Sequence, residues 1–433
     1  MKNTSLLALV LCAGVPVLAQ APVSLNIADV ATIKAGFLGQ LQFQSNTDPI
    51  YQGTSEAFVL RRGRLYLGGT VGDKIEFTVD TDQPKTGAPA SNVNGLQPSS
   101  SVVLVSTSGT TGTTTTSSTG ISTSNSMILQ DVVMTYKFCP QFVLDSGILT
   151  IDPNHDGLTG AARLFGNDTS AYASLQNTAV NTVSGNREVG VSARGLLGDH
   201  FEYHFGVTNG LRVNANDVPA TATVPSAPAA AAQSTSTISS NNAMRVTIRG
   251  QYDLFDNEGA GYTVAEEYFG HKKIVSFGAG YDHQNEYKQT TGDVFIDVPV
   301  NGGDVFNFEA NYWVYDGGTF LPSLLKQKDW SIQTGYLFGS TNIAPILRLE
   351  QKRYDNPGTT MNTAGVAGTN VNGNLNEDRQ CIGLAYFMKE HRANFKIFYN
   401  NIKPKDLTIG TATTTPVQNS YHQITAQFQI AAW

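Results

Sequence analysis

The chain has 433 residues, of which 15% are charged, with 28 lysines and arginines against 35 acidic residues. A formal net charge of −7 argues against nucleic acid as a partner, because such a partner requires a basic surface. The low charge content, together with 42 glycines, 17 tyrosines and 21 phenylalanines, favours many short strands and turns over helices.

Residues 1–19 have the features of a secretory signal peptide. Lys2 precedes the apolar run LLALVLCAGVPVL, and the segment ends at Val17-Leu18-Ala19. The run is too short for a membrane anchor, and Leu11 before Cys12 does not fit a lipoprotein cleavage site. We therefore expect export without a lipid anchor. Loss of the one lysine leaves 27 basic against 35 acidic residues, a net charge of −8.

Apolar and polar residues alternate strictly along the rest of the chain. In FNFEANYWV, for example, Phe306, Phe308 and Ala310 alternate with Asn307 and Glu309. Such alternation predicts strands with two unlike faces. About sixteen runs of this kind, most with the length of a strand that crosses a bilayer, start near residues 31, 56, 73, 127, 141, 185, 200, 243, 273, 293, 303, 328, 342, 378, 392 and 420.

The connections between these runs alternate between tight turns and long polar loops. Residues 69–73 and 198–199 are tight, whereas 83–126 and 212–241 are long and of low complexity. This pattern predicts an all-β fold, a transmembrane antiparallel β-barrel of about 16 strands formed by residues 20–433. A soluble β-sandwich or β-helix also alternates and is the alternative. Residues 253–272 lie where a tight turn is expected but form a long connection, and VAEEYFG is expected to form a helical turn there.

Several stretches resemble the phosphate-selective porin O/P family of Gram-negative outer-membrane porins. They include AFVLRRGRLYLGGTVGDKIEFTVD, NREVGVSARGLLGDHFEYHFGVTNG and RQCIGLAYFMKEHRANFKIFYNN, and the similarity runs from about residue 33 to the end, loops excepted. The resemblance implies a sixteen-stranded barrel in the outer membrane, usually a trimer, with the third loop folded into the lumen to narrow the pore. It implies phosphate selectivity less directly.

The expected lumen face of the barrel carries both signs of charge. The candidate basic residues are Arg62, Arg64, Arg194, Arg245, Arg249, Arg348 and Lys396. The same faces carry the acidic residues Asp131, Glu188, Glu202, Glu309 and Glu350. Basic side chains concentrate anions in a narrow pore, whereas a mixed lining makes the pore weakly selective.

The long loop at 152–184 takes the position of the constricting loop. Arg163 is its candidate solute-contacting residue, although a salt bridge to the barrel wall is an equal alternative. Asp152, Asn154, Asp156 and Gly157 match the start of a calcium-binding loop. The twelfth position, which needs a bidentate Glu, is Arg163, so that an Asx-type turn is expected rather than a metal site. No cofactor is expected.

Arg61 falls on the apolar face of its strand with Val59, Leu65 and Leu67, whereas Arg62 and Arg64 fall on the other face. An arginine facing lipid at mid-bilayer costs about 2–4 kcal/mol. Arg61 must therefore lie near the rim or be turned inward by a bulge. Pairing of these arginines with Asp131 and Glu76 on neighbouring strands is the alternative to solute contact.

The last strand, ITAQFQIA, is expected to close the barrel against residues 33–43, with its glutamines in the lumen. A terminal aromatic there resembles the signal for the barrel-assembly machinery, although Trp433 falls on the glutamine face. It is interpreted as an interfacial residue or as the sign of a bulge near Ala431. Cys139 and Cys381 fall at opposite ends of the barrel and are expected to be free thiols.

The sequence thus predicts a non-enzymatic porin that passes small hydrophilic solutes, and a preference for anions such as phosphate is the narrower hypothesis. The seven histidines are scattered, and GxSxG, HExxH and CxxC motifs are absent from the sequence. The alternative is a surface-binding or adhesin barrel that displays its Ser/Thr-rich loops. A barrel enzyme without a local motif is a third, less favoured hypothesis.

Overall fold

The computed structural model describes residues 23–27, 30–47, 53–83, 127–173, 187–211, 243–318, 320–321, 324–355, 360–361, 376–405, 408–409 and 420–432. Outside this range lie the predicted signal peptide at 1–19, the low-complexity stretches from residue 84 to 126 and from 212 to 241, residues 174–184 of the long loop, and Trp433. No helix of the described residues is long and apolar enough to cross a membrane.

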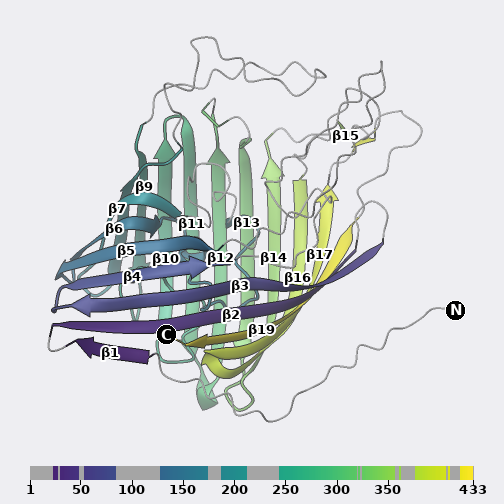
Figure 1. The fold of residues 1–433 in the computed structure, drawn as a ribbon. Helices are drawn as coiled ribbons and strands as arrows, with labels where there is room; N and C mark the ends of the chain where they lie inside the picture. The colour runs from purple at the N-terminus through teal and green to yellow at the C-terminus, as the bar shows by residue number, and fades with distance from the viewer. Residues whose placement is uncertain are drawn as a thin grey trace, which may run out of the picture.

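Sixteen antiparallel strands form one closed barrel (Figure 1), as the sequence predicts. Consecutive strands pair in chain order, and the last strand pairs back onto the first. The strands are β2 (Ala31–Thr47), β3 (Thr54–Val71), β4 (Ile75–Asp82), β5 (Ile128–Cys139), β6 (Phe142–Thr150), β7 (Arg187–Leu197), β8 (Phe201–Thr208), β9 (Arg245–Asp253), β10 (Ile274–Gln284), β11 (Tyr287–Pro299), β12 (Val305–Asp316), β13 (Gln327–Leu337), β14 (Ile343–Tyr354), β16 (Asn376–His391), β17 (Ala393–Lys405) and β19 (Tyr421–Ala432).

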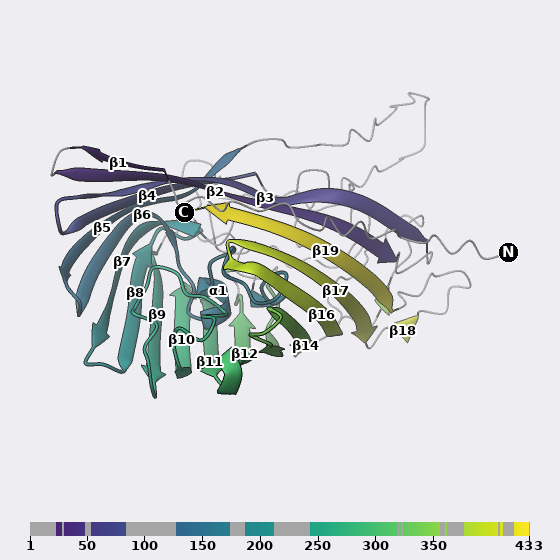
Figure 2. The same cartoon turned by 90° about the horizontal axis from the view of Figure 1, so that it is seen from below.

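The remaining elements are short. The strand β1 (Val23–Ile27) pairs with β2, and β15 (Thr360–Met361) forms a small parallel ladder with β18 (Thr408–Ile409). The helix α1 (His155–Leu158) lies within the ring of strands when the barrel is seen from below (Figure 2). The 3-10 turn η2 (Asn301–Gly303) joins β11 to β12.

The barrel is apolar outside and polar inside. In β12, Phe306 and Tyr312 are exposed on the outer face, whereas Asn307, Glu309 and Asn311 between them are buried. The same arrangement recurs in other strands, for example with exposed Ile248 between buried polar neighbours in β9. A soluble sandwich buries its apolar face in a core, so this inversion excludes the soluble alternative.

The seam of the barrel involves both β19 and β1. β19 pairs with β2 from Phe37 to Asn46, and β1 pairs with β2 from Ala31 to Ala35. Both run antiparallel to β2, so that they occupy successive parts of the same edge. The predicted closing strand is confirmed. Its glutamines face the lumen, where Gln427 and Gln429 bond to Gln42 and Gln40 at 2.7 Å each.

Two local expectations are wrong. The tenth run is expected to start near residue 293, but the corresponding strand β11 begins at Tyr287. Its first outward-facing residues are not apolar, so apolar–polar alternation does not reveal them. Residues 254–273 are a long connection, as expected, yet VAEEYFG forms no helical turn. This segment instead runs into the lumen, as the contacts below establish.

The two cysteines of the described residues provide a test of this topology. Both are free, with Cys139 exposed beside the turn after β5 and Cys381 buried in β16. A maleimide should modify Cys139 in the folded protein and reach Cys381 only after unfolding. Intact-mass measurement without reductant checks this, and a Cys139–Cys381 bridge would contradict the strand arrangement.

Candidate functional site

Two irregular segments occupy the lumen. The inner loop (residues 151–173) follows β6, and the lower insert (residues 254–273) follows β9 at the end of the barrel where the short turns lie. A segment without regular structure leaves its backbone N–H and C=O groups without partners of their own. The polar inner wall of the barrel supplies many of those partners, and this determines where both segments lie.

The inner loop begins with two Asx-type contacts, as the sequence predicts. Asp152 accepts a bond from the amide of Asn154 at 2.9 Å, and Asn154 caps α1 by accepting from the amide of Asp156 at 3.1 Å. Gly157 is required here, because a Cβ at that position would lie 2.0 Å from the Asp152 carboxylate. Within the described residues, no set of three His, Cys, Asp or Glu side chains is placed to hold a metal.

Basic side chains of the wall bind the carbonyl groups of the inner loop. Lys396 of β17 donates to the carbonyls of Leu164 and Gly166 at 2.7 Å each. Arg348 of β14 donates to the carbonyls of Asp168 and Thr169 at 2.6 and 3.1 Å. Because a charge-assisted bond is stronger than a neutral one, these two cations fix the middle of the loop against the wall.

Asp168 fixes the same loop to a further part of the wall, the strand β3. Its carboxylate accepts from Arg61 at 2.6 Å and from Arg62 at 2.8 Å. Both arginines reach it because β3 has a bulge, in which Gln40 pairs with Arg62 and Leu41 with Leu60. Arg61 is the extra residue and is turned into the lumen, which confirms one of the two expected solutions.

The last described part of the inner loop is bound by acidic and aromatic groups. Glu350 accepts from the amide of Ala171 at 2.9 Å, and the Tyr172 hydroxyl donates to Glu377 at 3.2 Å. Tyr315 of β12 donates to the Tyr172 carbonyl at 2.9 Å. The loop is thus bonded to strands on several sides of the lumen.

The lower insert is fixed by the same kind of contact. Glu202 of β8 accepts from the amides of Gly259 and Ala260 at 2.7 Å each, and Arg194 of β7 donates to the Ala260 carbonyl at 2.6 Å. The Tyr262 hydroxyl donates to Asp131 of β5 at 3.0 Å. Wall carboxylates hold backbone N–H groups, and wall arginines hold backbone carbonyls.

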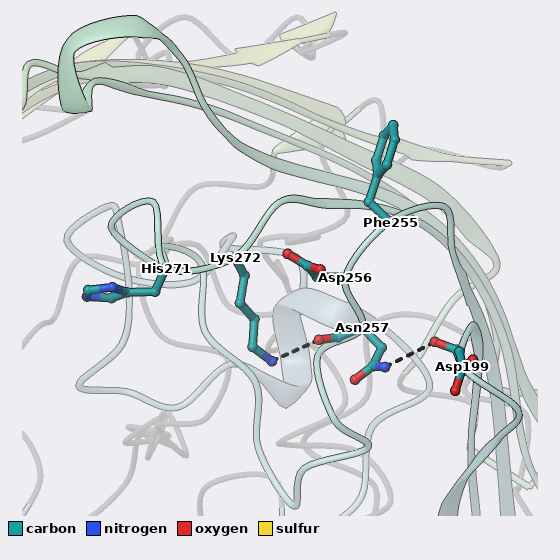
Figure 3. Close-up of a pocket in the computed structure, with 6 residues that line it drawn as sticks. All are labelled: Asp199, Phe255, Asp256, Asn257, His271 and Lys272. Atoms are coloured by element: carbon teal, nitrogen blue, oxygen red, sulfur yellow. Dashed lines mark hydrogen bonds between the residues drawn. The ribbon is translucent and has the colours of Figure 1, made fainter.

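The insert leaves the barrel wall at a pocket lined by Asp199, Phe255, Asp256, Asn257, His271 and Lys272 (Figure 3). Lys272 donates to the carbonyl of Asn257 at 2.8 Å, which joins the two ends of the insert. The Asn257 amide donates to the carbonyl of Asp199 in the neighbouring turn at 3.0 Å. The base of the insert is therefore closed on itself and attached to the rim.

The two segments also bind each other. Thr159 and Val264 form a short parallel bridge, with the Val264 amide donating to the Leu158 carbonyl at 3.1 Å. Glu266 accepts from the amides of Phe165 and Gly166 at 2.7 and 3.2 Å. The lumen contents are thus one connected body rather than two independent loops.

His155 lies at the centre of this body. Its Nδ1 is 3.0 Å from Glu309 of β12 and its Nε2 is 3.2 Å from Glu258 of the lower insert, and the ring stacks on Phe295 at 4.3 Å. Burial lowers the pKa of His155, but Glu258 and Glu309 outweigh it, so the pKa lies well above 6.5. Burial raises the pKa of Glu258, but His155 outweighs it and brings that pKa to about 2.

Most of the predicted solute-contacting residues have partners inside the barrel. Besides Arg62, Arg194, Arg348 and Lys396 above, ion pairs join Arg64 to Asp80 and Asp82, Arg245 to Asp282, and Arg249 to Asp293. Their role in solute contact stays a prediction. The alternative partners Asp131 and Glu76 are instead paired with Arg187 and Lys137.

Arg163 differs from these residues. Its side chain is half-buried, and no ion pair of the described part of the chain includes it. Its backbone is fixed, because its amide donates to the carbonyl of Gly160 at 2.7 Å and its carbonyl accepts from the amide of Glu266 at 3.1 Å. The inner loop thus presents a guanidinium whose charge is not neutralised by a described carboxylate.

Sequence reasoning missed the lower insert as a part of the site, and with it Glu258, Glu266 and Tyr262. The available signal was the length of residues 254–273 at the end where other connections are tight. It also missed Asp168 as the partner of Arg61 and Arg62, because no local pattern relates a loop carboxylate to a strand 106 or 107 residues away.

Asp168 provides a test of loop anchoring. Burial raises the pKa of Asp168, but the charges of Arg61 and Arg62 outweigh it and hold that pKa well below its ordinary value. The contribution of Asp168 to stability is therefore present above about pH 4 and is lost only as the pH falls through the depressed value.

Asp168→Asn should weaken the docking of the inner loop by about 1–3 kcal/mol, since bonds to charged groups contribute on that scale. Hydrogen exchange of residues 163–173 at pH 7 should rise in the variant, whereas wild type should keep its protection down to about pH 4. Asp199→Asn, in a rim turn, is the control. Equal exchange in both variants would contradict the anchor.

Neither a protein-family model nor a curated protein matches the sequence. Solved structures do match. The structure of OmpF from Salmonella typhi in complex with daunomycin is 11% identical, with 94% of this chain and 100% of that chain aligned and a TM-score of 0.52. An anion-selective porin from Comamonas acidovorans is 10% identical, with 93% and 99% aligned and a TM-score of 0.51. At this identity the likeness establishes the fold, that of an outer-membrane barrel. The resemblance to the phosphate-selective porin O/P family stays a prediction.

Proposed function

We propose that this protein is an outer-membrane porin of a Gram-negative bacterium, through which small hydrophilic solutes diffuse passively. The observation that carries the proposal is the inverted barrel: an apolar outer surface encloses a polar lumen that holds an inward loop. A closed barrel leaves no unpaired strand edge in hydrocarbon. Sixteen strands are enough for an aqueous channel, whereas eight fill their own interior.

The proposal extends to the placement of the chain. The signal peptide at 1–19 would direct export, residues 20–433 would form the single barrel domain, and the last strand would be recognised by the barrel-assembly machinery. The apolar outer surface would contact outer-membrane lipid, with the short turns in the periplasm and the long loops outside. A homotrimer is proposed from the family resemblance alone.

A preference for anions, with phosphate among them, rests on Arg163. A cation at a constriction with low-dielectric walls raises the local anion concentration. The other predicted solute-contacting cations are bonded to carboxylates or carbonyls, which partly compensates their fields. The lumen also holds carboxylates such as Glu202 and Glu350, which would favour cations if they contributed more than Arg163.

Planar-bilayer recordings test both the conduction of solutes and the preference for anions. The purified protein should conduct, and Arg163→Glu should shift the reversal potential in a KCl gradient toward cations. Phosphate should lower the chloride current of wild type more than that of the variant. Arg392→Glu, the same charge change at an exposed turn, is the control. Absence of conductance argues against the porin, and an unchanged reversal potential removes Arg163 from the constriction.

The second candidate function is a surface-binding or adhesin barrel, favoured by the Ser/Thr-rich stretch at 83–126. Deletion of residues 84–126 separates the two functions. A porin should keep its conductance within about twofold, because the barrel and both inward segments remain. Binding to host or bacterial surfaces, measured on whole cells, should be lost only if the adhesin reading holds.

A further inference from the structure

The contact between His155, Glu258 and Glu309 joins three separate parts of the molecule. His155 belongs to the inner loop, Glu258 to the lower insert and Glu309 to the barrel wall. All three side chains are almost completely buried, with exposed fractions of 0%, 0% and 3%. Glu266 of the lower insert also contacts all three parts, through hydrogen bonds from the inner-loop amides of Phe165 and Gly166 and from Gln333 of β13, whereas the contact at His155 is an ion pair.

The chemistry of this contact requires a cation at its centre. Both ring nitrogens face carboxylates, and a ring can donate from both nitrogens only as the imidazolium. Glu258 is further fixed by Gln251 at 2.8 Å and by the Tyr268 hydroxyl at 2.7 Å, and Glu309 by Asn311 at 3.1 Å. Loss of the imidazolium would leave two buried carboxylates facing each other without the charge between them.

The rest of the interface between the described segments consists of hydrogen bonds. Backbone bonds join Val264 to Leu158 and Gly160 and join the Glu266 amide to the Arg163 carbonyl, and the Glu266 carboxylate accepts from two amides. The inner loop enters from β6 and the lower insert from β9, at opposite ends of the barrel. Each segment is therefore attached to the wall at its own end of the barrel, and the buried ion pair at His155 is the charged contact between them.

We propose that His155 is an ionic latch that holds the inner loop and the lower insert together across the lumen and so limits its open width. The inference deepens the proposed channel function and, for its conductance readout, rests on it. The gate consists of both segments, and the latch couples them, so that one cannot leave the lumen while the other stays docked.

The main experiment compares wild type with His155→Gln. Single-channel conductance should rise at least about twofold in the variant. Hydrogen exchange should accelerate about tenfold in residues 151–173 and 254–273 alike, because a broken buried pair releases both of its sides. The matched control is His271→Gln, since His271 pairs with Glu390 at the same 3.0 Å but is 70% exposed. Both readouts should stay unchanged in the control.

A disulfide cross-link tests whether holding the two segments together restores the wild-type conductance. Thr159→Cys and Val264→Cys, with Cys139 and Cys381 replaced by serine, place two thiols at the parallel bridge. In the His155→Gln background the disulfide should restore the wild-type conductance, and a reductant should raise it again. Conductance that ignores the cross-link would overturn the latch.

Two further measurements distinguish a failure to fold from a failure to conduct. Heat-modifiable migration in detergent shows that the barrel has formed, and Glu258→Gln provides a second variant if His155→Gln does not fold. Exchange in the two segments does not depend on conduction, so a barrel that never conducts refutes the porin and leaves the latch open to test. Faster exchange in residues 151–158 alone, with 254–273 unchanged, would overturn the latch.

Discussion

The structure depends on one constraint: backbone groups of irregular chain inside a barrel must find hydrogen-bond partners on its wall. Arg348 and Lys396 meet this need for carbonyls of the inner loop, and Glu202 meets it for amides of the lower insert. The charges of the wall are therefore first of all structural. They place the two segments, and the segments in turn place Arg163 and His155.

The structural role of the wall charges changes what the mixed charge of the lumen implies for ion selectivity. A list of basic and acidic residues on the inner face suggests a weakly selective pore, but most of these charges are already matched within the protein. Under the proposed channel function, selectivity would depend on the charges that are left over. An arginine on an irregular loop would then contribute more than strand arginines that are paired with carboxylates, such as Arg64, Arg245 and Arg249.

The strand pattern could be predicted because a barrel in lipid gives every strand two unlike faces, and alternation reports this residue by residue. Alternation does not reveal the start of β11 at Tyr287. The first outward-facing residues there are lysine, threonine and glycine, which do not differ in polarity from the inward-facing ones. Because the position of Arg61 violates the pattern, the sequence predicts that it lies near the rim or is turned inward by a bulge, and the structure has the bulge. The pairing of Asp168 with Arg61, and of His155 with Glu258, could not be predicted, since irregular segments have no period and their partners are more than 100 residues away.

At the seam of the barrel, the last strand β19 and the first strand β1 together line one edge of β2. Along the edge of β2, Ala432 of β19 lies opposite Phe37, and Val23 of β1 lies opposite Ala35, with only Gly36 between them. β19 and β1 run in the same direction, so they trace one interrupted strand made from the two ends of the described chain. In terms of connectivity, the polypeptide is almost a ring. A circular permutant could join these ends through about one residue, since one residue spans one register step of a strand, and could be opened at a long loop without changing any pairing in the wall.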